Sequence, residues 1–340
     1  MATNPFKPSA GSSPPELIGR EASLQRIRDG VTEGPGAPGR ISLFSGARGI
    51  GKTVMLNEVE EAYQREGWSR VSLTATPSML GQLQAEVRRL LAAQVPKARR
   101  KITGISAGGL GIDWENTDTV DPSDLRHTVE QVLDALGPER GLLVTIDEVH
   151  GGERDQLREV AALSQHLVRD DRQFALAMAG LPSSVSNMLS DHVLTFLRRA
   201  DRHDLRALAV DDVEDALRHT VEASGRRLDR GAARTAAEAT AGYPFLVQLV
   251  GYHSWRESDG SRITAAHVGA GVANARQRLR ELVHETALSD LSDVDRAFLS
   301  AMALDDGPSR VSDLAARLEQ SRQYVNAYLR DTLREPGAVS

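Results

Sequence analysis

The sequence contains no cysteine, which excludes disulfide bonds and thiolate metal sites and is typical of proteins from a reducing compartment. It also lacks any run of about 18 uncharged apolar residues, the length that a helix needs to cross a bilayer. The first fifteen residues have no apolar core of the kind that a signal peptide carries. From these absences we expect a soluble, cytoplasmic protein with no membrane partner.

Histidine pairs with metal-binding spacing are missing as well. The nine histidines are scattered and none of them form a His-x₃-His pair, so a zinc site is not expected. An excess of positive charge is also absent, since the formal net charge is −6. This disfavours a protein that coats nucleic acid over its whole surface, although it leaves room for a local basic patch.

What is present is an ordinary globular composition, with 40% apolar and 26% charged residues. A chain of 340 residues exceeds a single core and indicates two or three domains. We expect a flexible tail over 1–15, an α/β domain over 16–208, a helical lid over 209–287 and a winged-helix-like domain over 288–340.

The fold class follows from how apolar runs alternate with amphipathic stretches before residue 209. We expect strands near 41–44, 71–75, 142–146 and 174–178, and helices near 53–66, 80–94, 125–136 and 153–168. This alternation predicts a parallel sheet covered by helices on both faces. A Gly-rich stretch at 102–114 suggests an inserted hairpin. Only helices are expected later, near 213–222, 232–241, 245–257 and 264–284.

A glycine-rich motif of the form Gly-x₄-Gly-Lys-Thr lies between the first predicted strand and the following helix. It comprises Gly46, Ala47, Arg48, Gly49, Ile50, Gly51, Lys52 and Thr53. Glycines let successive backbone N–H groups point at phosphate, and the helix start adds its positive dipole end. Lys52 would reach the β- and γ-phosphates, and the Thr53 hydroxyl would hold Mg²⁺. The motif predicts binding of ATP or ADP with Mg²⁺.

A second motif follows the apolar run at 142–146, which ends in Asp147 and Glu148. It resembles the Walker B motif of P-loop ATPases, which implies that Asp147 serves the Mg²⁺ shell. Glu148, at the end of a strand, would orient or deprotonate the attacking water as the catalytic base. The Asn-Lys-x-Asp pattern of GTPases is missing, so adenine is favoured over guanine.

Taken together, these motifs resemble the AAA+/STAND class of P-loop ATPases over about residues 17–333. The stretch Leu17-Ile18-Gly19-Arg20-Glu21 is similar to the opening of STAND proteins, and implies that Ile18, Gly19 and Arg20 lie against the base or ribose. Gly242-Tyr243-Pro244 resembles the Gly-x-Pro motif of the helical lid, which implies that Tyr243 and Pro244 contact nucleotide. Arg198 and Arg199 stand where relatives place an arginine that senses γ-phosphate or reaches a neighbouring subunit.

The last fifty residues resemble a winged helix. Ala315 and Val325 have helix-turn-helix spacing, Glu319 stands where the turn glycine usually lies, and a wing would begin at 337–339. Residues 290–340 hold nine acidic residues against six arginines, which predicts weak phosphate binding. Both protein docking and DNA binding therefore stay open for this part.

The leading hypothesis is a slow ATPase that acts as a nucleotide-dependent conformational switch or regulator, in which nucleotide between core and lid changes the angle between them. One alternative is a DNA-binding initiator or transcription regulator, similar to the archaeal replication initiators that join an AAA+ core to a winged helix. Another is an ATP-binding assembly scaffold with negligible turnover. The partners would be an unidentified protein, DNA, or further copies of the chain in a nucleotide-dependent oligomer.

Overall fold

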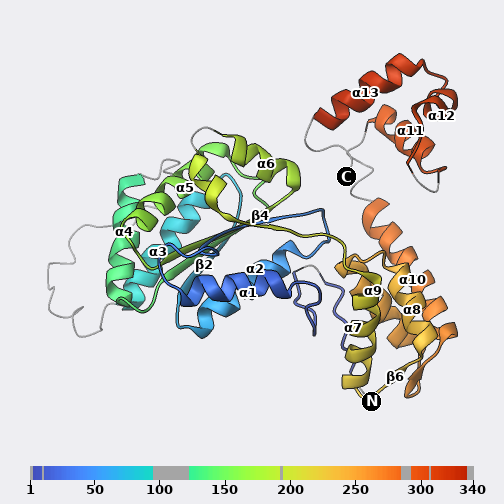
Figure 1. Cartoon of the computed structure of the whole chain (residues 1–340), viewed down its shortest axis with the longest axis horizontal. Helices are drawn as coiled ribbons and strands as arrows, with labels where there is room; N and C mark the ends of the chain where they lie inside the picture. Colours follow the sequence, from blue (N-terminus) through green and yellow to red (C-terminus); the bar gives the residue numbers. More distant parts are fainter. Residues whose placement is uncertain are drawn as a thin grey trace, which may run out of the picture. The chain divides into compact units, whose positions relative to one another are not determined.

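The computed structural model describes residues 3–9, 11–94, 122–191, 194–284, 292–305 and 308–334 (Figure 1). The chain divides into two compact units. One comprises Ser9–Asp212 with Tyr243–Phe245, and the other comprises Met1–Pro8, Val213–Gly242 and Leu246–Ser340. The hairpin expected at 102–114 and the wing expected at 337–339 lie outside the described residues.

The first unit is built on a five-stranded sheet in the order β2-β3-β4-β1-β5, in which every neighbouring pair is parallel. The strands are β1 (Ile41–Ser45), β2 (Ser69–Thr74), β3 (Leu142–Asp147), β4 (Phe174–Gly180) and β5 (Asp201–Asp204). All residues of β4 are buried, as are the first five of β3. The predicted fold class, a parallel sheet of the P-loop type covered by helices, is confirmed.

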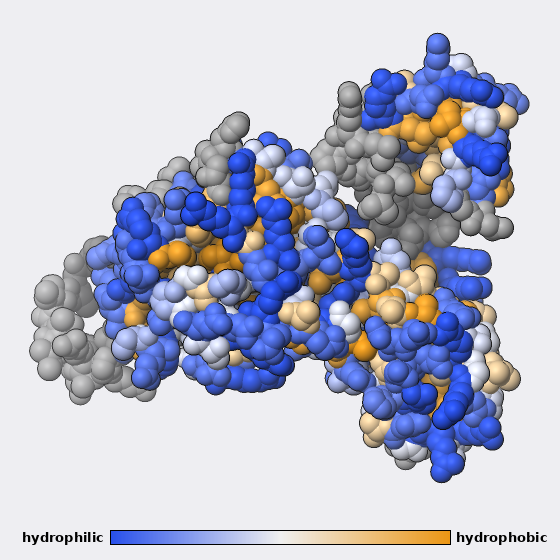
Figure 2. All heavy atoms as spheres, viewed as in Figure 1, coloured by the Kyte–Doolittle hydropathy of each residue, from blue (hydrophilic) through white to orange (hydrophobic). Residues whose placement is uncertain are grey.

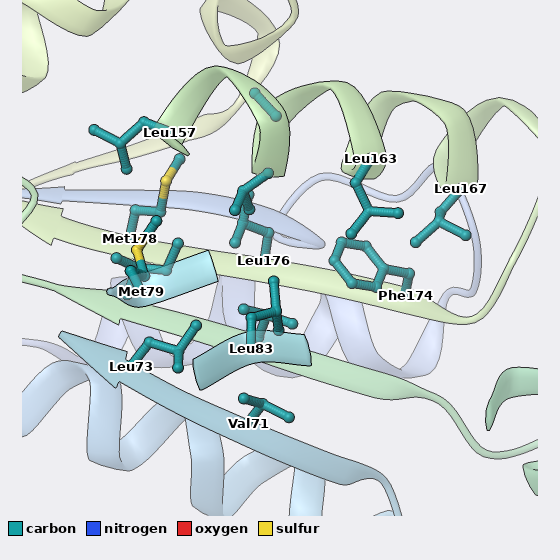
Figure 3. Close-up of a cluster of buried hydrophobic side chains, with 14 of the residues drawn as sticks. Val71, Leu73, Met79, Leu83, Leu157, Leu163, Leu167, Phe174, Leu176 and Met178 are labelled. Carbon is teal, nitrogen blue, oxygen red and sulfur yellow. The ribbon is translucent and has the colours of Figure 1, made fainter. Parts of the chain in front are cut away.

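Helices cover both faces of this sheet (Figure 1). They are α1 (Glu21–Thr32), α2 (Lys52–Arg65), α3 (Met79–Gln94), α4 (Pro122–Leu136), α5 (Arg154–Arg169) and α6 (Pro182–Ser190). Because side chains alternate along a strand, Val144 and Ile146 join the core beneath α3, α4 and α5, whereas Leu143 joins the core beneath α1 and α2. Figure 3 shows Leu157, Leu163 and Leu167 of α5 above Phe174, Leu176 and Met178 of β4.

The edge strand β5 has no counterpart among the predicted strands. Its sequence, Asp-Arg-His-Asp, has no apolar residue, so hydrophobic patterning gives no signal for it. His203 is nevertheless buried, and its ring stacks on Phe44 of β1 with centroids 4.5 Å apart. The strand is therefore specified by pairing with β1 and by one buried imidazole.

The second unit contains α7 (Val210–Ala223), α8 (Arg230–Ala239), α9 (Pro244–Glu257) and α10 (Ala265–His284). The expected succession of helices is interrupted by two short parallel strands, β6 (Arg227–Leu228) and β7 (Arg262–Ile263). Two-residue strands are too short to produce an alternating pattern, which explains why the sequence did not predict them. None of the described helices is long and apolar enough to pass through a lipid bilayer.

Part of the stretch expected to be a flexible tail lies against α9. Phe6 is only 4% exposed, and a Cβ on Gly251 would come within 2.4 Å of its ring. Asn4 donates through Nδ2 to the carbonyl of Tyr252 at 3.1 Å, and the Lys7 amide donates to Gln248 Oε1 at 3.1 Å. A single aromatic side chain and two hydrogen bonds thus attach residues 3–8 to the helical unit.

The C-terminal helices α11 (Asp293–Met302), α12 (Val311–Arg317) and α13 (Arg322–Arg334) share a small core of their own. Ala315 and Val325 are both buried in it. Glu319, between α12 and α13, has φ +51°, the left-handed conformation that a turn glycine usually supplies. Arg317 joins these helices by donating to Asp305 at 2.6 and 2.8 Å and to the Ala301 carbonyl at 2.7 Å.

Candidate active site

The glycine loop leaves β1 at Ser45 and enters α2 at Lys52. Two of its glycines are required by geometry. A Cβ on Gly46 would come within 2.6 Å of the Ile50 side chain and 2.9 Å of the Leu205 carbonyl. Gly51 has φ +96° at the start of α2, a conformation that L side chains rarely adopt. The loop therefore curls tightly around the helix N-terminus, where backbone N–H groups are available to anions.

Lys52 is held inside this loop. Its side chain is buried, and Nζ donates to the carbonyls of Gly46 and Ala47, both at 2.9 Å. Burial lowers the pKa of the Lys52 ammonium, while the charges of Glu148 and Asp147 act in the opposite direction. The lysine is a desolvated cation whose nearest oxygens are those of the loop itself.

Thr53 and Asp147 meet across the site, although they come from α2 and from the end of β3. The Thr53 hydroxyl donates to Asp147 Oδ2 at 2.6 Å, and the Asp147 Oδ1 accepts from the Glu148 amide at 2.8 Å. A hydroxyl and a carboxylate oxygen side by side fit Mg²⁺, which prefers oxygen ligands and takes only one or two carboxylates in nucleotide sites. These two residues would hold the ion.

Glu148 follows immediately and is oriented by an unusual backbone. Its φ is +56°, and its carboxylate oxygen Oε2 lies 3.1 Å from His150 Nδ1. The side chain of Glu148 is 47% exposed, so water can reach it. The sequence offers only one signal for His150, namely its position two residues after Glu148.

Glu60 is a second residue of this region that sequence reasoning missed. It is a buried carboxylate on α2 that accepts from Ser72 and Thr145 hydroxyls, each at 2.6 Å, and from the Arg70 guanidinium. These contacts join α2 to β2 and β3. Glu60 therefore fixes α2, which carries Lys52, relative to the strand that ends in Asp147.

Arg20 lies beside the glycine loop. Its guanidinium donates to the Arg206 carbonyl at 2.7 Å and to the Ile50 carbonyl at 3.4 Å, and burial lowers its pKa. Ile18 is partly buried, whereas Gly19 is exposed and has φ +63°. The structure brings this opening segment to the loop, and its contact with a base remains a prediction.

Tyr243 and Pro244 belong to a short segment that groups with the α/β unit, although the stretches on either side of it belong to the helical unit. Pro244 is the first residue of α9, and Tyr243 is 38% exposed. In the same segment, Phe245 lies beside the loop, because a Cβ on Gly49 would be 3.7 Å from its Cβ. Within the glycine loop itself, Arg48 lies between Ala47 and Gly49 and is exposed.

Arg198 and Arg199 are exposed and lie in a 3-10 helix, η2 (Thr195–Arg199), before β5. Arg198 Nε donates to the Leu189 carbonyl at 2.8 Å. β5 begins at Asp201 opposite Ser42, near the start of β1, whereas the glycine loop follows the end of β1. The two arginines therefore precede the entry of β5, and no hydrogen bond or ion pair joins them to Lys52, Asp147 or Glu148 in the described part of the chain.

A buried parallel strand that runs into a glycine loop and a helix, with a hydroxyl and a carboxylate paired beside a buried lysine, defines a P-loop nucleotide-binding protein. Residues 16–176 match the AAA ATPase domain family. The chain accordingly carries an AAA ATPase domain, which is a P-loop domain of the AAA+ class.

Comparison of folds agrees with this assignment. The structure is similar to the Walker-type ATPase PABY2304 of Pyrococcus abyssi, with a TM-score of 0.62, 14% identity, and coverage of 94% of this chain and 89% of that one. It is also similar to Cdc6p from Pyrobaculum aerophilum, with a TM-score of 0.50, 15% identity, and coverage of 96% and 89%. No protein of curated function matches the sequence. At these identities the likeness concerns the fold alone.

Proposed function

We propose that the protein binds ATP with Mg²⁺ at the glycine loop and hydrolyses it slowly, as a nucleotide-dependent conformational switch. The observation that carries this proposal is the 2.6 Å contact between Thr53 Oγ1 and Asp147 Oδ2 beside the buried ammonium of Lys52. Phosphate, metal and lysine are the components that phosphoryl transfer requires in P-loop enzymes. The protein groups that would contact phosphate and metal come here from two separate elements, the start of α2 and the end of β3.

Each of the site residues would have a separate role in hydrolysis. The water oxygen forms a bond to the γ-phosphorus, the bond from that phosphorus to the β,γ-bridging oxygen breaks, and a water proton passes to the Glu148 carboxylate. Lys52 offsets the negative charge of the β- and γ-phosphates. Mg²⁺, when bound by Thr53 and Asp147, would neutralise phosphate oxygens.

Support for a switch comes from the segment that includes Tyr243 and Pro244. It groups with the α/β unit while the remainder of α9 groups with the helical unit. If Tyr243 and Pro244 contact nucleotide as the family resemblance implies, with Ile18, Gly19 and Arg20 at the base, the nucleotide state would act on the start of a helix that belongs to the other unit. Hydrolysis would thereby change a conformation rather than a metabolite.

The test combines two measurements on the purified chain. Phosphate release is followed with ATP and Mg²⁺, and thermal unfolding is recorded with ATP, ADP and no nucleotide. The switch predicts both slow phosphate release and stabilisation by each nucleotide, since a ligand that binds the folded state raises its stability. Stabilisation without phosphate release would favour the assembly scaffold. The absence of both phosphate release and stabilisation would refute nucleotide binding.

A second function, contact with DNA through α13, is favoured by the side chains of its exposed face. These are Arg322, Gln323, Asn326 and Arg330, all exposed in the structure. Arg, Gln and Asn are the residue types that pair with base edges and phosphates. A duplex shift assay at rising salt tests it, because phosphate contacts weaken steeply with salt.

The same helices also present apolar surface, which suits a protein partner. Figure 2 shows hydrophobic side chains on the visible face of the C-terminal helices, and Val294, Leu304 and Tyr324 are exposed. Leu304 is 72% exposed. If the shift assay shows no duplex binding, protein docking is the role that remains for this part.

Arg198 and Arg199 fit a role in a neighbouring copy of the chain. They are exposed and precede β5, away from the glycine loop of their own chain. An arginine supplied by a neighbour would offset charge in the transition state. Light scattering with size exclusion in ATP and in ADP tests this, because an arginine that acts on another copy requires an oligomer.

A further inference from the structure

The carboxylate of Glu148 lies beside the imidazole of His150. Among the described residues, the imidazole of His150 is the group that lies within ion-pair distance of this carboxylate, with Nδ1 3.1 Å from Oε2. The side chain of Glu148 is 47% exposed and that of His150 is 25% exposed. Without this contact, a half-exposed glutamate would sample several rotamers.

The backbone between the two residues keeps them together. Glu148 has φ +56°, and the Gly151 amide donates to the Glu148 carbonyl at 2.8 Å, which closes a tight turn. A left-handed conformation is strained at a residue other than glycine, and persists only where the surroundings impose it. The turn is therefore imposed by its neighbours.

Those neighbours lie at the ends of the two strands that flank β3. On one side the Val149 amide donates to the Ala179 carbonyl at 3.0 Å, and a Cβ on Gly180 would come within 2.3 Å of Val149 Cγ2. On the other side a Cβ on Gly152 would come within 2.9 Å of the Ala75 Cβ. The turn is packed against β4 and against the end of β2, so the backbone that carries His150 is held in place.

The chemistry of the two groups indicates which of them, the imidazole or the carboxylate, carries the proton in this contact. An ionised carboxylate only accepts hydrogen bonds, so a hydrogen bond across this 3.1 Å contact would have Nδ1 of His150 as its donor. Such a bond would engage Oε2 of Glu148 and leave Oε1 to accept a proton from water. Aligning a base in this way matters, since a misplacement of about 1 Å can slow a reaction on the order of 100-fold.

We propose that His150 is a positioning residue for hydrolysis, which holds the Glu148 carboxylate in the orientation that accepts the proton of the attacking water. This inference rests on the proposed ATPase function. His150 makes no direct contact with ATP in this scheme. Its loss therefore lowers kcat and leaves ATP binding unchanged.

Three substitutions distinguish a positioning role of His150 from a role in packing. His150→Ala removes the donor, His150→Asn places an amide N–H close to the position of Nδ1, and His150→Gln places it near the position of Nε2. We expect kcat to fall by about tenfold or more in the alanine and glutamine variants, with KM and the Kd for a fluorescent ATP analogue within about twofold of wild type. The asparagine variant is expected to recover most of kcat.

Two controls accompany these variants. His127→Ala removes an exposed histidine on α4 that pairs with Gln131 at 3.0 Å, and is expected to leave kcat unchanged. Glu148→Gln in the same assay shows whether the carboxylate is needed at all. Thermal unfolding of each variant shows that it is folded.

The inference is overturned if His150→Ala keeps or raises kcat, or if His150→Asn is as slow as His150→Ala. If Glu148→Gln stalls turnover while His150→Ala does not, the inference about His150 fails and the proposed hydrolysis stands. A wild-type chain with no turnover would overturn both.

Discussion

The hydroxyl of Thr53 donates to Asp147 Oδ2 at 2.6 Å, although 94 positions separate the two residues in the sequence. One belongs to the first turn of α2 and the other ends β3, two strands away from the strand that precedes the glycine loop. Their pairing prepares two oxygen ligands at the place where the phosphates of a nucleotide would lie.

From this pairing we predict that Thr53→Val loses the dependence of ATP affinity on Mg²⁺, whereas Thr53→Ser keeps it. Valine has the shape of threonine without the oxygen, so only the ligand changes. ATP affinity is measured by titration at several Mg²⁺ concentrations. An unchanged Mg²⁺ dependence in the valine variant would remove Thr53 from the metal site.

Lys52→Ala is expected to weaken ATP binding by about 10- to 100-fold, since hydrogen bonds to charged groups contribute roughly 1.5–3 kcal/mol each. Alanine removes the buried cation that donates to the Gly46 and Ala47 carbonyls. Lys7→Ala is the matched control, because Lys7 lies in the segment on α9. Equal ATP affinity in the two variants would contradict the role given to Lys52.

Glu148→Gln is expected to retain ATP affinity and to slow phosphate release by about 100-fold or more, because general-base catalysis contributes roughly 10²–10⁴-fold. The amide has nearly the same size and lacks the basic oxygen. Single-turnover phosphate release measures the chemical step. Turnover at the wild-type rate would assign the base to another group.

Glu60→Gln is expected to lower the free energy of unfolding by about 1–3 kcal/mol, since hydrogen-bond donors on β2 and β3 would lose a charged acceptor. The control is Glu61→Gln, because Glu61 is 56% exposed and pairs with Arg65 on the surface, where ion pairs contribute roughly 1 kcal/mol or less. Urea denaturation of both variants provides the comparison. Similar losses of unfolding free energy in the two variants would mean that the buried contacts of Glu60 stabilise the fold no more than the surface pair of Glu61 does.

Stability is expected to fall as pH drops from about 6.5 toward 4. Burial lowers the pKa of His203 from 6.5 to about 4, and Arg26 donates to its Nδ1 at 3.0 Å, which favours the neutral ring. In that window the unfolded chain binds a proton that the folded chain does not, so acid favours unfolding, by on the order of 2–3 kcal/mol in total. Urea denaturation at pH 7.5, 6.5 and 5.5 should show a shallower pH slope for His203→Gln than for wild type.

The sequence predicted the parts of the fold and site that are encoded locally. The glycine loop needs only a strand, eight residues and a helix start, and all three can be read from neighbouring positions. Glu60 has three partners on β2 and β3, and no spacing in the sequence relates them to α2. The same holds for β5, whose strand geometry depends on pairing with β1 and not on its own polar residues.

The contact between Phe6 and Gly251 has a practical consequence for preparing the protein. The family match begins at residue 16, yet the helical unit is assembled from three separate stretches of chain, one of them at the N-terminus. A shortened protein that starts at residue 16 would leave the apolar surface around Gly251 uncovered, and aggregation is the expected result. For the same reason an affinity tag is better placed at the other terminus, where it does not crowd Asn4.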